Sequence, residues 1–242
     1  MSDNTDMLDG IDLVNDDCIH FLSTIEDKSV DLVLIDPPYQ ISRQTNFASG
    51  DKKGTDVDRF RVSMDFGRWD KNFYKMKQVI EECYRVLKKG GTLICFYDLW
   101  KITELKEYLE NAKFVQLRFI EWIKTNPVPL NSSTNYLTNA REVAITATKG
   151  GKPTFNSTYD NGVYKFPIYQ GKDRIHPTQK PTDLISKLIL KHSNVDDLVL
   201  DCFSGSGTTA VSCLLTNRRF IGCELDTGYY YQSLKRLIDM TK

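Results

Sequence analysis

Long apolar runs and export signals are both missing from this sequence. Its longest uninterrupted apolar stretch is only a few residues, which is too short for a transmembrane helix. The first ten residues are polar and acidic, without the apolar core of a secretory signal. We therefore expect no membrane partner and no export.

Metal sites and disulfides are equally unsupported. The sequence has 3 histidines and 6 cysteines, but no Cys-x-x-Cys pair and no histidine spaced to complete a zinc site. Several cysteines fall in expected strands or helices, where free thiols are commonly buried. We expect no bound metal and a reduced, cytoplasmic setting. The cysteines are Cys18, Cys83, Cys95, Cys202, Cys213 and Cys223.

Net charge is absent as well, because 32 basic residues balance 32 acidic ones. Total charge therefore gives no support for a nucleic-acid partner. The distribution is less even: residues 40–77 carry nine Lys or Arg against five Asp or Glu, and residues 148–180 carry six against two. Such runs are usually solvated loops, but a position beside a binding site would suit them to phosphate contact.

What is present is the composition of an ordinary globular domain, with 40% apolar and 26% charged residues in a chain of 242. Apolar runs of strand length alternate with segments of helical periodicity. This succession predicts an α/β fold with a doubly wound, mostly parallel, seven-stranded sheet that includes one antiparallel hairpin. The expected strands are 11–15, 30–35, 92–97, 114–123, 142–147, 198–202 and 220–223, and the expected helices are 18–25, 74–87, 99–110, 182–192, 207–215 and 228–238.

Three breaks in this pattern stand out. The basic residues and glycines at 88–91 are typical of a helix end. Residues 40–72 are polar with little periodicity, and residues 150–175 combine glycines, aromatic residues and basic residues in an irregular pattern. Connections of this length are usually functional or disordered. We expect a single domain over residues 1–242, with 40–72 as a flexible loop and 150–175 as a small insertion.

The most informative residues are Asp36-Pro37-Pro38-Tyr39, directly after the buried strand 30–35. Two prolines cannot continue a central strand, because they lack an N–H donor and fix φ. The strand end therefore presents a carboxylate, a backbone carbonyl and an aromatic ring at the edge of the sheet where ligands bind. Two acceptors beside a flat ring suit a planar substrate that carries an amino group, such as a nucleobase.

A glycine-rich turn follows the strand 198–202. Gly205-x-Gly207-x-x-Ala210 fits a dinucleotide-binding fingerprint, and Glu224 lies 19 residues beyond Gly205 at the end of the next strand. The missing side chains let a ligand approach the backbone, and a strand-end acid can accept both ribose hydroxyls. The turn by itself fits NAD, FAD or S-adenosylmethionine equally, and a purely structural turn is a further alternative.

Taken in chain order, five segments together resemble the β group of amino DNA methyltransferases, permuted enzymes in which the catalytic motif precedes the cofactor motif. The resemblance extends from residue 13 to residue 238. One departure is Cys202, where this group usually has proline. The segments are Leu13-Val14-Asn15-Asp16-Asp17-Cys18, Asp36-Pro37-Pro38-Tyr39, Trp122-Ile123-Lys124-Thr125-Asn126-Pro127, His176-Pro177-Thr178-Gln179-Lys180-Pro181 and Phe203-Ser204-Gly205-Ser206-Gly207-Thr208-Thr209.

The resemblance implies a circularly permuted, Rossmann-like methyltransferase fold in which Asp36, Pro37, Pro38 and Tyr39 are catalytic. In the mechanism of this group, the Asp36 carboxylate and the Pro37 carbonyl each accept one N–H of an exocyclic amino group. The target base is flipped out of the duplex and stacks on Tyr39. An aspartate at position 36, where cytosine-N4 enzymes more often have serine, favours adenine N6, with cytosine N4 as the alternative. No Pro-Cys dipeptide occurs, which counts against methylation of a cytosine ring carbon.

S-adenosylmethionine is the cofactor that the same resemblance implies. Asp17 and the Cys18 amide would contact its adenine, Glu224 its ribose, and the turn from Phe203 its methionine half. His176 and Lys180 would bind its carboxylate or order the turn, and the role of Glu142 is left open. The full expected set is Asp17, Cys18, Asp36, His176, Lys180, Phe203, Ser204, Gly205, Gly207, Thr208 and Glu224.

DNA, double- or single-stranded, is the expected partner of a bacterial or phage-encoded enzyme of this kind. The candidates for target recognition are the loop 41–70 and the segment 150–175. The segment 150–175 has interleaved aromatic and basic residues, which suit strand separation and phosphate contact. It is short for that task, so we expect a homodimer or action on single strands. No nuclease motif is recognisable, so any restriction nuclease would be a separate chain.

Two rival functions belong to other classes. A NAD-dependent oxidoreductase would use the glycine turn, but it leaves Asp36-Pro37-Pro38-Tyr39 unexplained. A catalytically silent DNA-binding protein is the second rival, and the intact tetrapeptide speaks against it.

Overall fold

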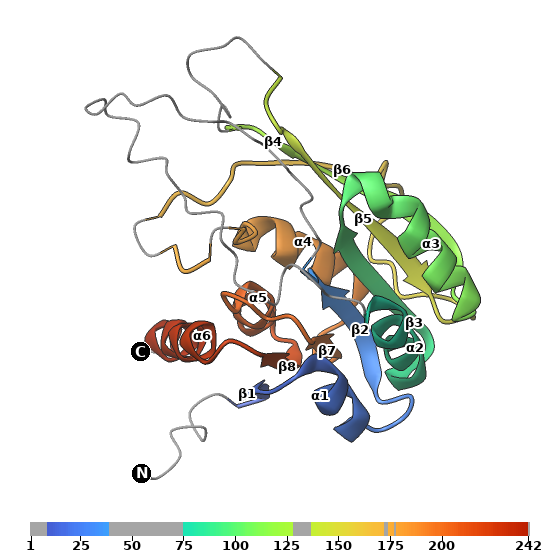
Figure 1. The fold of residues 1–242 in the computed structure, drawn as a ribbon, viewed down its shortest axis with the longest axis horizontal. Coiled ribbons are helices and arrows are strands. Elements are labelled where there is room, and N and C mark those ends of the chain that lie inside the picture. The colour runs from blue at the N-terminus through green and yellow to red at the C-terminus, as the bar shows by residue number, and fades with distance from the viewer. Residues whose placement is uncertain (1–8, 39–74, 128–136, 172–173, 177, 242) are drawn as a thin grey trace.

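The structure is a computed structural model that describes residues 9–38, 75–127, 137–171, 174–176 and 178–241. Tyr39 and the expected loop 40–72 lie outside the described residues. Within the described part, eight strands form a single sheet in the order β1-β8-β7-β2-β3-β5-β4-β6 (Figure 1). The strands are β1 (Ile11–Asn15), β2 (Val30–Ile35), β3 (Leu87–Tyr97), β4 (Val115–Lys124), β5 (Arg141–Thr148), β6 (Val163–Phe166), β7 (Leu198–Asp201) and β8 (Arg219–Glu224).

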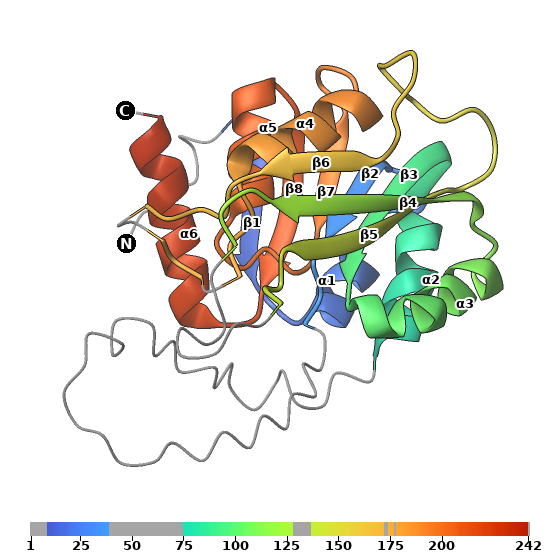
Figure 2. The same ribbon diagram turned by 90° about the horizontal axis from the view of Figure 1, so that it is seen from above.

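Two layers of helices cover the two faces of this sheet (Figure 2). One core cluster joins the sheet to α1, α2 and α3, and a second joins it to α4, α5 and α6. The α/β, doubly wound architecture expected from the sequence is therefore confirmed. The helices are α1 (Cys18–Thr24), α2 (Met76–Val86), α3 (Ile102–Asn111), α4 (Thr182–His192), α5 (Thr208–Thr216) and α6 (Thr227–Met240), with a short 3₁₀ helix η3 (Leu99–Lys101) before α3.

The chain changes direction across the sheet between β7 and β2. These strands pair in parallel, with Leu32 opposite Val199 and Val33 opposite Leu200. From β2 the chain continues to β3 on one side, and from β7 it continues to β8 on the other. The carboxyl ends of β2 and β7 therefore flank a topological switch point, where open α/β sheets bind their ligands.

β5 alone runs against the other strands of the sheet. It pairs antiparallel with both β3 and β4, whereas β4 and β6 are parallel. The expected hairpin of β4 and β5 is thus present. Because β5 is reversed, its amino-terminal residue pair Arg141 and Glu142 reaches the same edge as the carboxyl ends of β2, β3 and β4.

Two local expectations need correction. The count of seven strands is one short, because β6 forms inside the segment 150–175, which was expected to be irregular. The alternation of exposed Val163 and Lys165 with buried Tyr164 explains this strand, since Tyr164 packs in the core. Residues 88–91, expected to end a helix, instead belong to β3, where Gly90 takes a positive φ of 84°.

Two further observations concern the chain as a whole. All six cysteines are free and buried, as expected. No helix in the described part of the chain is long and apolar enough to span a membrane.

Candidate active site

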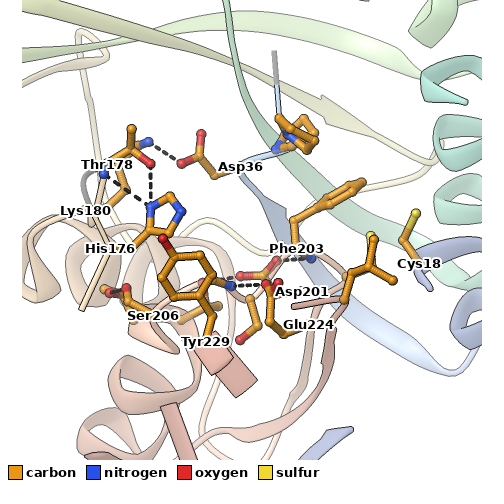
Figure 3. A pocket seen from close by; sticks show the side chains of 18 of the residues that line it. Cys18, Asp36, His176, Thr178, Lys180, Asp201, Phe203, Ser206, Glu224 and Tyr229 are labelled. Carbon is orange, nitrogen blue, oxygen red and sulfur yellow. Dashed lines mark hydrogen bonds and ion pairs between the residues drawn. The ribbon is translucent and has the colours of Figure 1, made fainter. Parts of the chain in front are cut away.

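A cavity of about 280 Å³ opens at the switch point (Figure 3). Its walls come from the segments that follow β1, β2, β7 and β8, together with residues 176 and 178–180 before α4 and Tyr229 in α6. These segments are far apart in the sequence, and the parallel sheet brings their ends to one edge. The cavity is therefore the place where the two sequence motifs meet.

Asp36, Pro37 and Pro38 form the wall that follows β2. β2 is almost completely buried up to Ile35 and ends where the prolines remove the N–H donors. The Asp36 carboxylate turns toward the ammonium group of Lys180 and accepts a hydrogen bond from it at Oδ2 (Figure 3). A carboxylate acceptor is thus held at the carboxyl end of the central strand.

Lys180 is itself held by a second carboxylate. Its Nζ lies 3.0 Å from Glu142 Oε2, and Lys124 Nζ lies 2.7 Å from Glu142 Oε1. Burial raises the pKa of Glu142, but the charges of Lys180 and Lys124 outweigh it and lower the pKa below its usual value. Glu142 is therefore ionised near neutral pH, and four alternating charges run from Lys124 to Asp36.

The glycine turn begins after β7 and is fixed by hydrogen bonds that its backbone N–H groups donate to two carboxylates and one carbonyl. Phe203 N donates to Asp201 Oδ1 at 2.9 Å, Gly205 N to Glu224 Oε2 at 2.7 Å, and Gly207 N to Ser204 O at 2.8 Å. A Cβ atom added at Gly205 would meet only one atom within 4 Å, the Phe203 carbonyl at 3.9 Å. The backbone at Gly205 therefore leaves room for a ligand to approach.

Ser204 carries the clearest sign of a missing partner. Its hydroxyl is buried and has no hydrogen-bond partner among the described residues. A buried hydroxyl without a partner is costly, so such groups usually bond to a ligand or to water. Since Ser204 lines the cavity, this observation points to a polar ligand group beside the turn.

Two acids at neighbouring strand ends sit under the turn. Burial raises the pKa of Asp201 to about 7, although hydrogen bonds from Thr209 and Phe203 oppose the shift. Burial also raises the pKa of Glu224, whose Oε1 accepts from Asp226 N at 2.8 Å. Both carboxylates are thus partly desolvated acceptors in a concave site, a common property of functional groups.

The segment after β1 forms the opposite wall. Asp17 caps α1, accepting from Ile19 N at 3.0 Å, and its Oδ2 lies 3.2 Å from Lys75 Nζ. Cys18 follows as the first residue of α1, and burial raises the pKa of its thiol to about 12. Asp17 therefore has a structural task at the helix end in addition to any contact with a ligand.

His176 and Tyr229 close the remaining side, with ring centroids 4.6 Å apart in an edge-to-face arrangement (Figure 3). His176 Nδ1 accepts from Thr178 N at 3.2 Å. Burial, together with the charges of Lys180 and Arg174, lowers the pKa of His176 to about 4. The imidazole is therefore neutral near pH 7 and presents an uncharged face to the cavity.

Comparison with known proteins decides the family. Residues 30–235 match the family model for N6 and N4 methyltransferases, whose description is DNA methylase. The chain belongs to this DNA methylase family. The methylase is therefore an enzyme, and its family membership agrees with the resemblance seen in the sequence.

Named relatives agree along most of the chain. The methylase is 34% identical to the type II methyltransferase M2.MboI of Moraxella bovis, over 93% of this chain and 86% of that protein. It is 33% identical to M2.DpnII of Streptococcus pneumoniae (93% and 88%) and 31% identical to M.HinfI of Haemophilus influenzae (93% and 67%).

Solved structures show the same fold. The complex of M1.HpyAVI with SAM superposes with a TM-score of 0.71 at 27% identity, covering 94% of this chain and 98% of that chain. The cytosine-N4-specific PvuII DNA methyltransferase superposes with a TM-score of 0.68 at 16% identity, covering 96% and 93%. The expected methyltransferase fold is thus confirmed.

Most of the residues singled out in the sequence meet at this one cavity of the methylase. Gly207 does not line it: its φ is +71°, and an added Cβ would lie 3.0 Å from Ser233 Cβ in α6, so the glycine serves helix packing. Tyr39 lies outside the described residues. The expected residues that line the cavity are Asp17, Cys18, Asp36, Pro37, Pro38, His176, Lys180, Phe203, Ser204, Gly205, Thr208 and Glu224.

Sequence reasoning missed several other residues of the site. Asp201 was detectable, because it is the last residue of a strand that leads into the glycine turn. Lys75, Phe96 and Tyr229 also line the cavity, but each lies in an ordinary helix or strand pattern that carries no local signal. Only the packing of distant elements brings them there.

Proposed function

We propose that this methylase transfers a methyl group from S-adenosylmethionine to the exocyclic N6 of adenine in DNA. The observation that carries the proposal is the meeting of Asp36 and the glycine turn in one cavity, at the ends of the paired strands β2 and β7. A site for an amino group and a site for a nucleotide-like cofactor are then neighbours, as methyl transfer between them requires.

The residues present fit S-adenosylmethionine. The buried hydroxyl of Ser204 and the open backbone at Gly205 suit its methionine half, and Glu224 suits its ribose. Asp17 and the Cys18 amide would hold its adenine. When bound, this cofactor supplies the methyl group as an electrophile. The solved complex of M1.HpyAVI with SAM, at 27% identity, supports the same choice.

The residues of the enzyme itself would activate the amino nitrogen of the base as a nucleophile. Its lone pair is delocalised into the base ring, which makes the nitrogen a poor nucleophile. Acceptance of one N–H by Asp36 and of the other by the Pro37 carbonyl draws the nitrogen toward tetrahedral geometry. Fixed acceptors in a partly closed site need no reorganisation during the reaction, so they stabilise the charge that develops.

The choice of adenine rests on Asp36. The fold does not decide it, since the cytosine-N4-specific PvuII enzyme has a similar fold. An aspartate in this tetrapeptide favours adenine N6, because the cytosine-N4 enzymes among the amino DNA methyltransferases more often have serine at this position. Cytosine N4 is the alternative product.

DNA contact is assigned to the segment 150–175 and to residues 40–72, with the target base flipped into the cavity. Tyr159 supports the first assignment, because 94% of its surface is exposed. Tyr164 does not take part, since it is buried in the core. We further assign the enzyme to the bacterial or phage-infected cytoplasm, with any restriction nuclease as a separate chain.

A homodimer is part of the proposal, because a recognition segment of this size is small for one protomer on duplex DNA. Sedimentation of the enzyme with duplex DNA is expected to give two protomers per site. A monomer that methylates duplex DNA at full rate in dilute solution would overturn this part. Action on single-stranded DNA is the alternative explanation for the small segment, and the same result would overturn it.

The direct test is transfer of an isotope-labelled methyl group from S-adenosylmethionine to DNA by the wild type and by Asp36→Asn. We expect the variant to lose at least about 100-fold in turnover. The asparagine oxygen can still accept an N–H, but the negative charge that stabilises the positive charge developing on the nitrogen is lost. Its affinity for S-adenosylmethionine, measured by calorimetry, should stay near that of the wild type. Binding of NAD in place of S-adenosylmethionine would favour the oxidoreductase instead.

Asp98→Asn is a matched control for this test. Asp98 follows the neighbouring strand β3 at the same sheet edge and caps η3 through Trp100 N. It is not among the residues that line the cavity. The control should therefore turn over like the wild type, and equal losses in both variants would contradict a special role for Asp36.

A further inference from the structure

Four charged side chains from four separate segments form one line that ends at Asp36. Lys124 ends β4, Glu142 is the second residue of β5, Lys180 precedes α4, and Asp36 follows β2. Glu142 lies between the two ammonium groups, at 2.7 Å from Lys124 Nζ and 3.0 Å from Lys180 Nζ. Lys180 then contacts Asp36 Oδ2. Positive and negative charges alternate along the whole line.

Stability is a weak explanation for this line of charges. Lys180 retains 5% of its side-chain exposure, Lys124 11% and Glu142 23%. Removing charges from water costs free energy that their mutual attraction repays only in part, so buried ion pairs add little net stability. The position of the line, which ends on the proposed acceptor Asp36, suggests that it serves the reaction.

The geometry fixes Lys180 from three directions. Its Nζ contacts Asp36 and Glu142 and lies 5.1 Å from the centre of the Phe96 ring. An ammonium group held in this way constrains the orientation of the Asp36 carboxylate through Oδ2. The other carboxylate oxygen, Oδ1, is then the one we assign to the amino N–H of the base.

Glu142 determines how strongly Lys180 acts on Asp36. With Glu142 ionised, the charge of Lys180 is shared between two carboxylates, and Asp36 keeps enough negative charge to accept an N–H strongly. Without that charge, Lys180 would pair with Asp36 alone and weaken it as an acceptor. We propose that Glu142 is a positioning residue for methyl transfer, acting through Lys180 on Asp36; this inference rests on the proposed function.

The lining of the cavity agrees with an indirect role. Lys180 and Asp36 are among the described residues that line it, whereas Glu142 and Lys124 are not. Glu142 is therefore placed to act on Asp36 rather than on substrate or cofactor. Lys180, expected from the sequence to contact the cofactor, is assigned here to the base side of the cavity.

The test is Glu142→Gln, which keeps the shape of the side chain and removes its charge. We expect kcat to fall by about tenfold or more, since small displacements of reacting groups are costly. The KM for DNA and the affinity for S-adenosylmethionine should stay unchanged. A wild-type kcat in this variant would overturn the proposal.

Glu121→Gln is the matched control. Glu121 lies on the same hairpin, has 25% exposure and pairs with Arg141 at 3.4 Å, but it has no contact with Lys180 among the described ion pairs. Its substitution removes an equivalent charge and should leave kcat unchanged. An equal loss of kcat in both variants would show a general effect of the hairpin and contradict the proposal.

A double-mutant cycle separates action through Lys180 from an independent effect. In a Lys180→Met background, adding Glu142→Gln should lower kcat no further. An additive loss would contradict the proposal. If Glu142→Gln does not fold, Glu142→Asp is measured instead, because it keeps the charge but retracts the carboxylate from Lys180. We expect kcat of this variant to fall by less than tenfold. An unchanged kcat would overturn the proposal.

Methyl transfer by the wild type distinguishes failure of the proposed function from failure of the role assigned to Glu142. Absence of methyl transfer by the wild type would defeat the proposed function itself. Transfer by the wild type together with a fully active Glu142→Gln variant would defeat only the role assigned to Glu142.

Discussion

At the end of β7, the single carboxylate of Asp201 should make stability depend on pH. Its pKa is about 7 in the folded protein and near 3.8 when unfolded, because burial disfavours the charge. The folded state therefore keeps a proton that the unfolded state loses, so the stability due to that proton disappears as pH rises from about 4 to about 7.

Asp201→Asn removes this titration and tests it. Without cofactor, we expect the stability of the variant relative to the wild type to increase by about 2–3 kcal/mol between pH 5 and pH 8. Urea unfolding at both pH values measures the free energy of unfolding of the two proteins. The contributions of other titrating groups cancel in the difference, because both proteins share these groups. Parallel pH profiles would contradict a buried, protonated Asp201.

Individual residues were predictable from the sequence where one motif contained them. Asp36 and Glu224 were identified because each stands at the end of an expected strand, in a motif whose residue types suit binding of a ligand. The contact of Lys180 with Asp36 was not predictable, since it joins segments separated by 144 residues and depends on tertiary packing. The role of Glu142 was left open for the same reason, because its ion-pair partners Lys124 and Lys180 come from two other segments.

At the scale of elements, the packing of α6 against the glycine turn fixes the shape of the cavity. Ser233 Oγ donates to Gly205 O at 2.7 Å, and Arg236 Nη1 donates to Ser206 O at 3.0 Å. Gly207 lets the turn lie against α6, because it has no side chain toward Ser233. The turn and the last helix therefore form one unit.

Gly207→Ala tests this packing, with Gly150→Ala as a control. Both glycines have positive φ, +71° and +57°, but only Gly207 has a neighbour that an added Cβ would crowd. We expect Gly150→Ala to cost about 1 kcal/mol and Gly207→Ala about 2–4 kcal/mol in unfolding free energy. Urea unfolding measures both losses, and equal values would show that the contact with Ser233 does not matter.

Elements with strong periodicity matched their predictions closely. The expected ranges of β1, β2 and α4 agree with the structure. β6 was missed because only four residues of alternating pattern lie among glycines and polar residues. β3 begins earlier than expected because Lys88 to Gly91, which resemble a helix end, pair within the sheet instead; tertiary pairing outweighs the local signal there.

At the scale of the whole molecule, motif order carried more information than periodicity. Alternating strands and helices predicted an α/β sheet, but not which strands are neighbours. Periodicity does not predict the pairing of β2 with β7; motif chemistry favours it, because a catalytic motif on one strand and a cofactor motif on the other must meet. The DNA sequence that the proposed recognition segment 150–175 would read could not be derived, because base readout depends on side-chain placement against DNA.

The methylated base that the enzyme forms is the most direct measure of its proposed function. DNA incubated with the enzyme and S-adenosylmethionine is digested to nucleosides, and the methylated base is identified by mass spectrometry. We expect N6-methyladenine, formed by the wild type and strongly reduced with Asp36→Asn. N4-methylcytosine as the only product, or no methylated base at all, would contradict this expectation.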